Sequence, residues 1–155
     1  MSIYKGIGKI LKIGTLVSTL GLIATVSLQI FARFFLASAP SWTEEASRLF
    51  FIYAISFASG IALKNNSYVG LDMFYNMFSA RIRKLLDILI PTLILALFGV
   101  VMVCAIQFVF IGNVEKSPSM GIRMSLAFLS IFIMSVTVCF CASIKIKAAV
   151  KNSKK

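Results

Sequence analysis

The chain carries few side chains that could transfer protons, attack a substrate or bind a metal ion. Among its 155 residues there is no histidine, and there are only five acidic residues. Two of these acids, Glu44 and Glu45, are adjacent and stand at the start of an apolar stretch, close in sequence to Gln29, Arg33 and Arg48. Such a pair could relay a proton or hold a cation, or it could cancel the charge of the two arginines.

The other candidates for reactive groups are three cysteines, Cys104, Cys139 and Cys141, and all three lie inside apolar runs. Buried thiols of this kind are inert. Cys139 and Cys141 would project about 200° apart around a helix, so they cannot easily share a metal ion. A serine or cysteine nucleophile would also lack a histidine base. We therefore expect no enzymatic activity, no catalytic, metal-binding or substrate-binding residue, and no cofactor.

The composition is that of a membrane protein. Hydrophobic residues make up 59% of the chain, charged residues make up 14%, and the mean hydropathy is +0.96. Soluble domains carry about 25% charged residues, so this chain has too few charged side chains to cover a water-facing surface. Its net charge of +11 comes from short basic groups at the ends of apolar segments, not from a basic face interleaved with aromatic residues. The pattern excludes nucleic acid as a partner and indicates membrane lipids instead.

The apolar segments predict an all-α integral membrane four-helix bundle that forms a single membrane domain over residues 1–155. The expected spans are residues 13–36, 42–63, 85–111 and 122–144. The first segment could instead be a signal peptide, because residues 37–39 resemble a cleavage site. Its length, the interrupting Arg33 and the following Pro40 favour a retained span. Gly60 and Gly99 are expected to allow close approach between helices.

Between the second and third spans, residues 71–83 have the pattern of an amphipathic helix. Asp72, Asn76, Ser79 and Arg83 would form one polar stripe, and mostly apolar residues cover the rest. The segment is too short to span a membrane and too apolar to be free in water, which predicts a helix lying in the interface. A short connector packed against the bundle is the alternative.

The basic residues predict the orientation of the chain. If both termini are cytoplasmic, twelve of the sixteen Lys and Arg residues lie on that side. The other side then holds Arg33, Arg48, Lys116 and Arg123, and the first two of these lie within helices. Because cytoplasmic loops retain Lys and Arg, the pattern predicts that both termini face the cytoplasm.

The turn between the first two spans should bring the polar residues of this region together at the outer boundary of the membrane. They would form a neutral structural cluster of Gln29, Arg33, Glu44, Glu45 and Arg48. We expect Arg33 to pair with Glu44 or Glu45 and so to hold the hairpin together. Ser41 and Glu44 have the spacing of a helix capping box, and Trp42 would be an interfacial anchor. A proton or ion relay, and a contact surface for a partner subunit, remain the alternatives for this cluster.

Three stretches also match a known family: QIFARFF at residues 29–35, WTEEASR at 42–48 and FASGIAL at 57–63. The sequence here resembles the small membrane subunit of tripartite ATP-independent periplasmic (TRAP) transporters. The resemblance extends loosely over the whole chain in length, in its four spans and in the amphipathic segment between them. It implies a large multi-span partner subunit that carries the substrate and sodium sites. It also implies a soluble periplasmic binding protein that delivers a carboxylate-bearing substrate, such as a dicarboxylate or a sialic acid.

The resemblance implies an accessory subunit of the bacterial inner membrane that scaffolds the large subunit and helps to dock the binding protein. Glu115, Lys116 and Arg123 would then be the contacts with the binding protein on the outer side. Two other functions remain open. The chain could be a self-sufficient proton-coupled exporter that uses Glu44 or Glu45, or a membrane structural or assembly factor without transport activity.

Overall fold

The computed structural model describes residues 2–35, 40–64 and 80–153. These residues form four long helices: α1 (Ser2–Phe35), α2 (Trp42–Lys64), α4 (Ala80–Ile111) and α5 (Ser125–Ser153). No strand occurs in the described ranges, and the one β-type feature there is an isolated bridge between Lys116 and Arg123. The all-helical fold is therefore confirmed.

Each of the four helices is long and apolar enough to cross a membrane. The candidate spans are Gly6–Phe35, Trp42–Leu63, Ile82–Ile111 and Ser125–Lys151. The predicted number of spans is therefore confirmed by length and composition. The predicted interfacial helix stays a prediction, because residues 71–79 lie outside the described residues and residues 80–83 belong to the first turn of α4.

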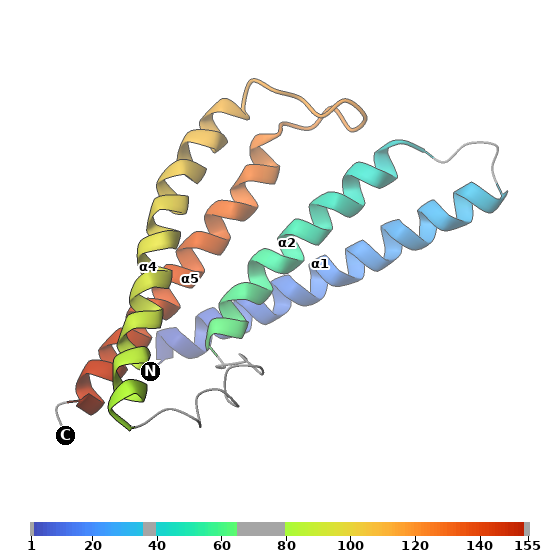
Figure 1. The fold of residues 1–155 in the computed structure, drawn as a ribbon. Helices are drawn as coiled ribbons and strands as arrows, with labels where there is room; N and C mark the ends of the chain where they lie inside the picture. Colours follow the sequence, from blue (N-terminus) through green and yellow to red (C-terminus); the bar gives the residue numbers. More distant parts are fainter. Residues whose placement is uncertain (1, 36–39, 65–79, 154–155) are drawn as a thin grey trace.

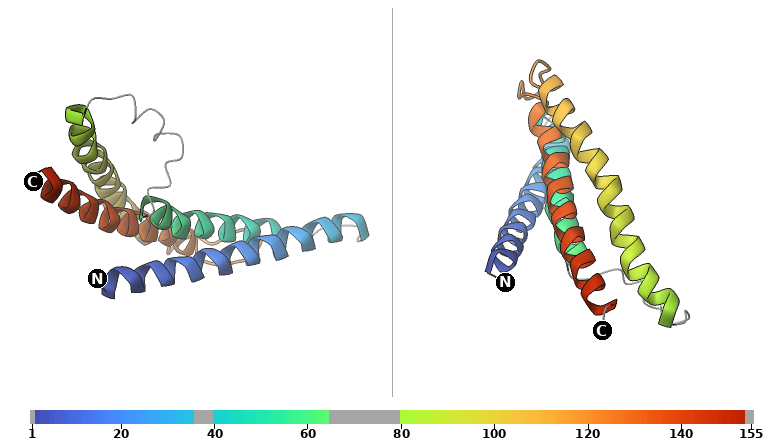
Figure 2. Two further views of the ribbon diagram at one scale, coloured as in Figure 1. Left: turned by 90° about the horizontal axis from the view of Figure 1, so that it is seen from below. Right: turned by 90° about the vertical axis from the view of Figure 1, so that its left-hand side faces the viewer.

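The helices form two antiparallel hairpins, α1–α2 and α4–α5, that meet through α2 and α5 (Figure 1). The order of packing is α1 on α2, α2 on α5 and α5 on α4, so the bundle is open and α1 and α4 lie at its two edges. Figure 2 shows that the Ser2 end of α1 and the Ser153 end of α5 lie at the same end of the molecule. The α4–α5 loop (residues 112–124) lies at the opposite end and extends towards the start of α2 (Figure 1).

Glycine and phenylalanine hold the α1–α2 hairpin together. A Cβ added to Gly14 would lie 2.8 Å from the ring of Phe57, and one added to Gly21 would lie 2.6 Å from the ring of Phe50. The two glycines are seven residues apart on α1, and the two phenylalanines are seven residues apart on the antiparallel α2, which is about two turns of an α-helix in each case. Each ring therefore fills the space left by a missing side chain, which brings the two backbones close.

The two hairpins join at Gly60 of α2. A Cβ at this position would lie 3.0 Å from Leu11 of α1 and 3.1 Å from Thr137 of α5, and the Cys141 thiol lies 3.6 Å from the Gly60 carbonyl oxygen. A small buried core of Leu63, Val138, Cys141 and Ala142 continues this contact. The prediction of close packing is confirmed for Gly60. It is wrong for Gly99, where nothing lies within 4 Å of an added Cβ because α4 is at the edge of the bundle.

Candidate functional site

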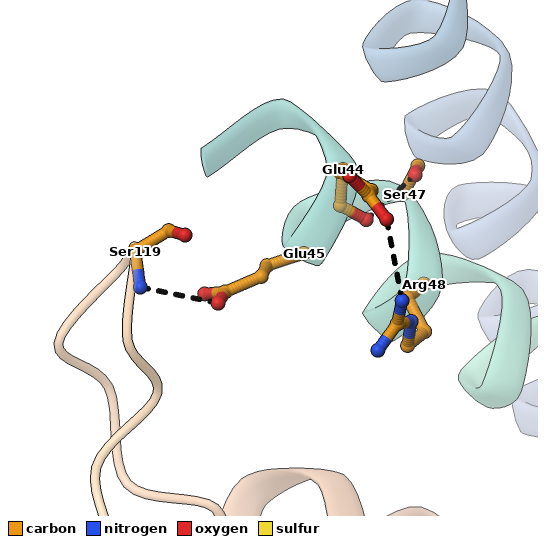
Figure 3. A network of polar contacts seen from close by, with 5 residues as sticks. All are labelled: Glu44, Glu45, Ser47, Arg48 and Ser119. Carbon is orange, nitrogen blue, oxygen red and sulfur yellow. Dashed lines mark hydrogen bonds and ion pairs between the residues drawn. The ribbon is translucent and has the colours of Figure 1, made fainter. Parts of the chain in front are cut away.

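The carboxylate of Glu45 connects the first turn of α2 to the α4–α5 loop. It accepts hydrogen bonds from the Ser117 hydroxyl, from the Ser119 backbone N–H at 3.1 Å and from the Met120 backbone N–H at 3.0 Å. Figure 3 shows the Glu45 side chain pointing away from Glu44 and Arg48 towards Ser119. Three donors on one carboxylate tie the first hairpin to the second at the end opposite the termini.

The α4–α5 loop presents these donors because it is folded as a tight turn of its own. The Ser117 N–H donates to the Ile122 carbonyl at 2.8 Å, and the Met124 N–H donates to the Glu115 carbonyl at 3.0 Å. Gly121 has a φ of +66°, a left-handed conformation that glycine adopts without steric cost. The turn leaves the N–H groups of residues 119 and 120 unused by the loop itself and available to an anion.

Glu44 has a different partner. Its carboxylate forms an ion pair with Arg48 of the next turn, at 3.4 Å, and the two side chains are 66% and 72% exposed. Exposed pairs one helical turn apart stabilise a helix by only about 0.3–0.5 kcal/mol. The adjacent glutamates therefore differ: Glu44 makes a weak contact within its own helix, and Glu45 makes a long-range one.

Within the described ranges, no hydrogen bond or ion pair joins the two cluster residues of α1, Gln29 and Arg33, to those of α2. Among the described residues, no ion pair joins Arg33 to Glu44 or Glu45, and Arg33 lies exposed in the last turn of α1. Gln29 is half-buried on α1. Arg48 lies one turn after Glu44 on the same helix. Glu45 directly follows Glu44, and its side chain is therefore rotated about 100° around the helix, towards the α4–α5 loop. The expected pairing of Arg33 is thus replaced by two separate contacts.

The start of α2 also differs in detail from the prediction. Ser41 immediately precedes the first helical residue, as a capping residue should, but its side chain makes none of the hydrogen bonds found in the described ranges. Thr43 anchors this turn instead, since its hydroxyl donates to the Pro40 carbonyl at 2.7 Å and its N–H donates to the same oxygen at 3.1 Å. Thr43 is fully buried, and Trp42 is 42% exposed, which leaves the anchor role of Trp42 a prediction.

Beneath the Glu45 contact lies a mostly apolar cavity of about 340 Å³. Its lining comes from α2, from the α4–α5 loop and from the start of α5, and includes Leu49, Ile52, Ile122, Ala127 and Phe128. Arg48 and Arg123 belong to the lining as well. Sequence reasoning missed both the cavity and the partners of Glu45. Two of these partners are backbone donors, which no side-chain pattern reveals, and the third, the Ser117 hydroxyl, lies in a loop more than seventy residues away.

The three residues proposed as binding-protein contacts all lie on the α4–α5 loop and are exposed. Lys116 and Arg123 form the isolated bridge, with Glu115 directly before it. Arg123 donates to the Asn113 side-chain oxygen at 3.4 Å. Within the described ranges, the side chains of Glu115 and Lys116 make no hydrogen bond or ion pair. They can therefore bind a partner without breaking a contact inside this chain.

The four membrane-length helices of the described residues place this chain in the class of multi-pass membrane proteins. Comparison with known proteins is more specific. A model of the DctQ component of tripartite ATP-independent periplasmic transporters matches residues 22–152, and the chain belongs to this family. It is a small permease subunit of a TRAP transporter and a multi-pass protein of the inner membrane. Subunits of this family work with a large membrane subunit and a binding protein.

Two curated relatives agree with this assignment. The chain is 25% identical over 140 residues to a Haemophilus influenzae protein assigned as a TRAP transporter small permease protein, covering 90% of this chain and 85% of that one. It is 29% identical over 86 residues to the sialic acid TRAP transporter small permease protein SiaQ of Vibrio cholerae, covering 56% of this chain and 50% of SiaQ.

Proposed function

We propose that this chain is the accessory subunit of a sodium-coupled importer of carboxylate-bearing substrates, of the sialic acid or dicarboxylate class. It scaffolds the large transport subunit and helps to dock the periplasmic binding protein. The name of the Vibrio cholerae relative supports the sialic acid class. The observation that carries the docking role is the contact of Glu45 with Ser117, Ser119 and Met120, since it fixes the α4–α5 loop on the bundle.

The open bundle supports the scaffold role. Large apolar side chains that are more than half exposed run along both edges, among them Ile10, Leu16 and Leu20 on α1 and Leu85, Leu93 and Leu97 on α4. Lipid covers such faces, and so does a second membrane protein that packs helix against helix. Two uncovered edges give a large subunit a long surface on which to pack.

The proposed topology has both termini in the cytoplasm. Both ends of the described chain lie at one end of the molecule, as an even number of spans requires (Figure 2). Twelve of the sixteen basic residues would lie on that side. The α4–α5 loop would then face the periplasm and present Glu115, Lys116 and Arg123 to the binding protein.

The test is uptake by the complete transporter in proteoliposomes, with Glu45→Ala compared with Glu44→Ala. Sialic acid is the first substrate, with a dicarboxylate measured in parallel, and uptake is followed as the binding-protein concentration is raised. Glu45→Ala removes the acceptor for three loop donors, so we expect less assembled complex and a several-fold higher binding-protein concentration at half-maximal uptake. The maximal rate per assembled complex should not change.

Glu44→Ala is the matched control, because it removes the adjacent acid of the same helix turn, whose carboxylate pairs with Arg48 and does not touch the loop. We expect uptake close to that of the unmodified transporter. A Glu45→Ala complex that is fully assembled but inactive at every binding-protein concentration would contradict the proposal. Solute accumulation by this chain alone under a proton gradient would instead support an exporter that uses Glu45.

A further inference from the structure

The cavity beneath the α4–α5 loop combines an apolar interior with two arginines. Its volume of about 340 Å³ lies within the range of pockets that hold small ligands, about 300–1,000 Å³. Leu49 and Ile52 of α2 line it on one side, and Ala127 and Phe128 of α5 line it on the other. The interior therefore suits a hydrocarbon chain.

The two arginines in the lining are held only weakly by other groups. Arg48 lies 3.4 Å from Glu44 with its side chain 72% exposed, and Arg123 lies 3.4 Å from the Asn113 side-chain oxygen. Glu45 also lines the cavity, and three neutral loop donors bind its carboxylate without cancelling its charge. The lining therefore carries two arginines and one carboxylate, which leaves an excess of one positive charge.

The position of the cavity in the bundle agrees with a lipid site. Arg48 lies six residues after Trp42, about 9 Å along the axis of a helix. Since Trp42 begins the second candidate span, Arg48 is within reach of the headgroup layer if its long side chain extends towards the membrane surface. The apolar lining of the cavity would then lie at the depth of acyl chains.

We propose that this cavity binds an anionic phospholipid, with one acyl chain between α2 and α5 and the phosphate between Arg48 and Arg123. The lipid would fill the space between the two hairpins where the α4–α5 loop crosses from one to the other. The proposal does not depend on the transported substrate or on docking of the binding protein.

The experiment uses the complex of the small and large subunits in lipid nanodiscs. Phosphatidylglycerol that carries a photoreactive diazirine near the end of one acyl chain is the probe, and phosphatidylcholine with the same chain is the comparison. Labelled peptides are mapped by mass spectrometry. We expect phosphatidylglycerol to label residues 49–52 and 127–128 more than phosphatidylcholine does. The expected preference is about fivefold for each arginine, because a basic residue near the membrane surface favours an anionic lipid by about that factor.

The variant Arg48→Gln/Arg123→Gln should abolish this preference while leaving assembly with the large subunit intact. Arg33→Gln is the control, because it removes an exposed arginine at the same end of the bundle that does not line the cavity. Ala127→Phe, which fills the cavity, should reduce labelling by both lipids. Equal labelling by the two lipids, or a preference that survives the double substitution, would overturn the proposal. Labelling that is seen only when the large subunit is absent would also overturn the proposal, since a side chain of the large subunit would then fill the cavity in the complex.

Discussion

Replacing Gly60 with alanine should loosen the junction between the two hairpins, and the same change at Gly99 should not. An added Cβ at Gly60 meets Leu11 at 3.0 Å and two atoms of Thr137 at 3.1 and 3.2 Å, whereas one at Gly99 meets nothing within 4 Å. Leu11 can move the end of its side chain. The Thr137 side chain has less freedom to rotate, because its hydroxyl donates to the Ile133 and Met134 carbonyls of its own helix, both at 2.9 Å.

The size of the effect follows from comparing the two variants. Alanine in place of glycine favours a helix by about 1 kcal/mol, and this gain is common to both positions. At Gly60 the contacts are shorter than the optimum of about 3.5–4.0 Å, and overpacking of this kind costs about 1–3 kcal/mol. The difference between the two unfolding free energies should therefore be about 1–3 kcal/mol, with Gly60→Ala the less stable variant.

Thermal unfolding in mild detergent, followed by circular dichroism, measures this difference. For a chain of this size each kcal/mol shifts Tm by about 2–4 °C, so Gly60→Ala should melt about 2–12 °C below Gly99→Ala. Equal melting temperatures for the two variants would refute the packing of α1, α2 and α5 around Gly60.

Two further substitutions test the contacts of α5 with its neighbours. Gly112→Ala would place a Cβ 2.6 Å from the Phe128 ring and 2.8 Å from the Ser125 backbone nitrogen, so we expect a larger drop in Tm than for Gly60→Ala, or a loss of folded protein; a stable variant would refute the geometry of the turn after α4. Tyr53→Phe removes the hydroxyl that donates to the Leu126 carbonyl at 2.8 Å, which should lower the unfolding free energy by about 0.5–1.5 kcal/mol in the same melting experiment. An unchanged Tm would mean that this bond between α2 and α5 is not formed.

The amino-acid sequence was sufficient to predict the helices and the family. Runs of apolar residues long enough to span a membrane occur four times, and each forms a long helix in the structure. Pro40 lies two residues before α2, and Gly112 directly follows α4, where a Cβ would meet the Phe128 ring. The stretch WTEEASR indicated the TRAP small subunit, and the family comparison confirms this.

The partners of the polar residues could not be predicted in the same way. Spacing correctly places Arg48 within reach of Glu44, because both lie on one helix. It suggested Arg33 as the partner of Glu44 or Glu45, since few residues separate the first two spans in the sequence. The actual partners of Glu45 are mainly backbone N–H groups of Ser119 and Met120, and no residue type encodes an available backbone donor.

The sequence by itself determined that this chain is a set of four membrane-length helices, because burial of apolar side chains in lipid depends on local composition and length alone. Only the tertiary structure decided which helix faces meet. Gly60 and Gly99 are both glycines in apolar helices, yet one is enclosed by two other helices and the other lies at an open edge. Tertiary structure likewise separates Glu44 from Glu45, because a rotation of about 100° points Glu45 at the α4–α5 loop, more than seventy residues away in the sequence.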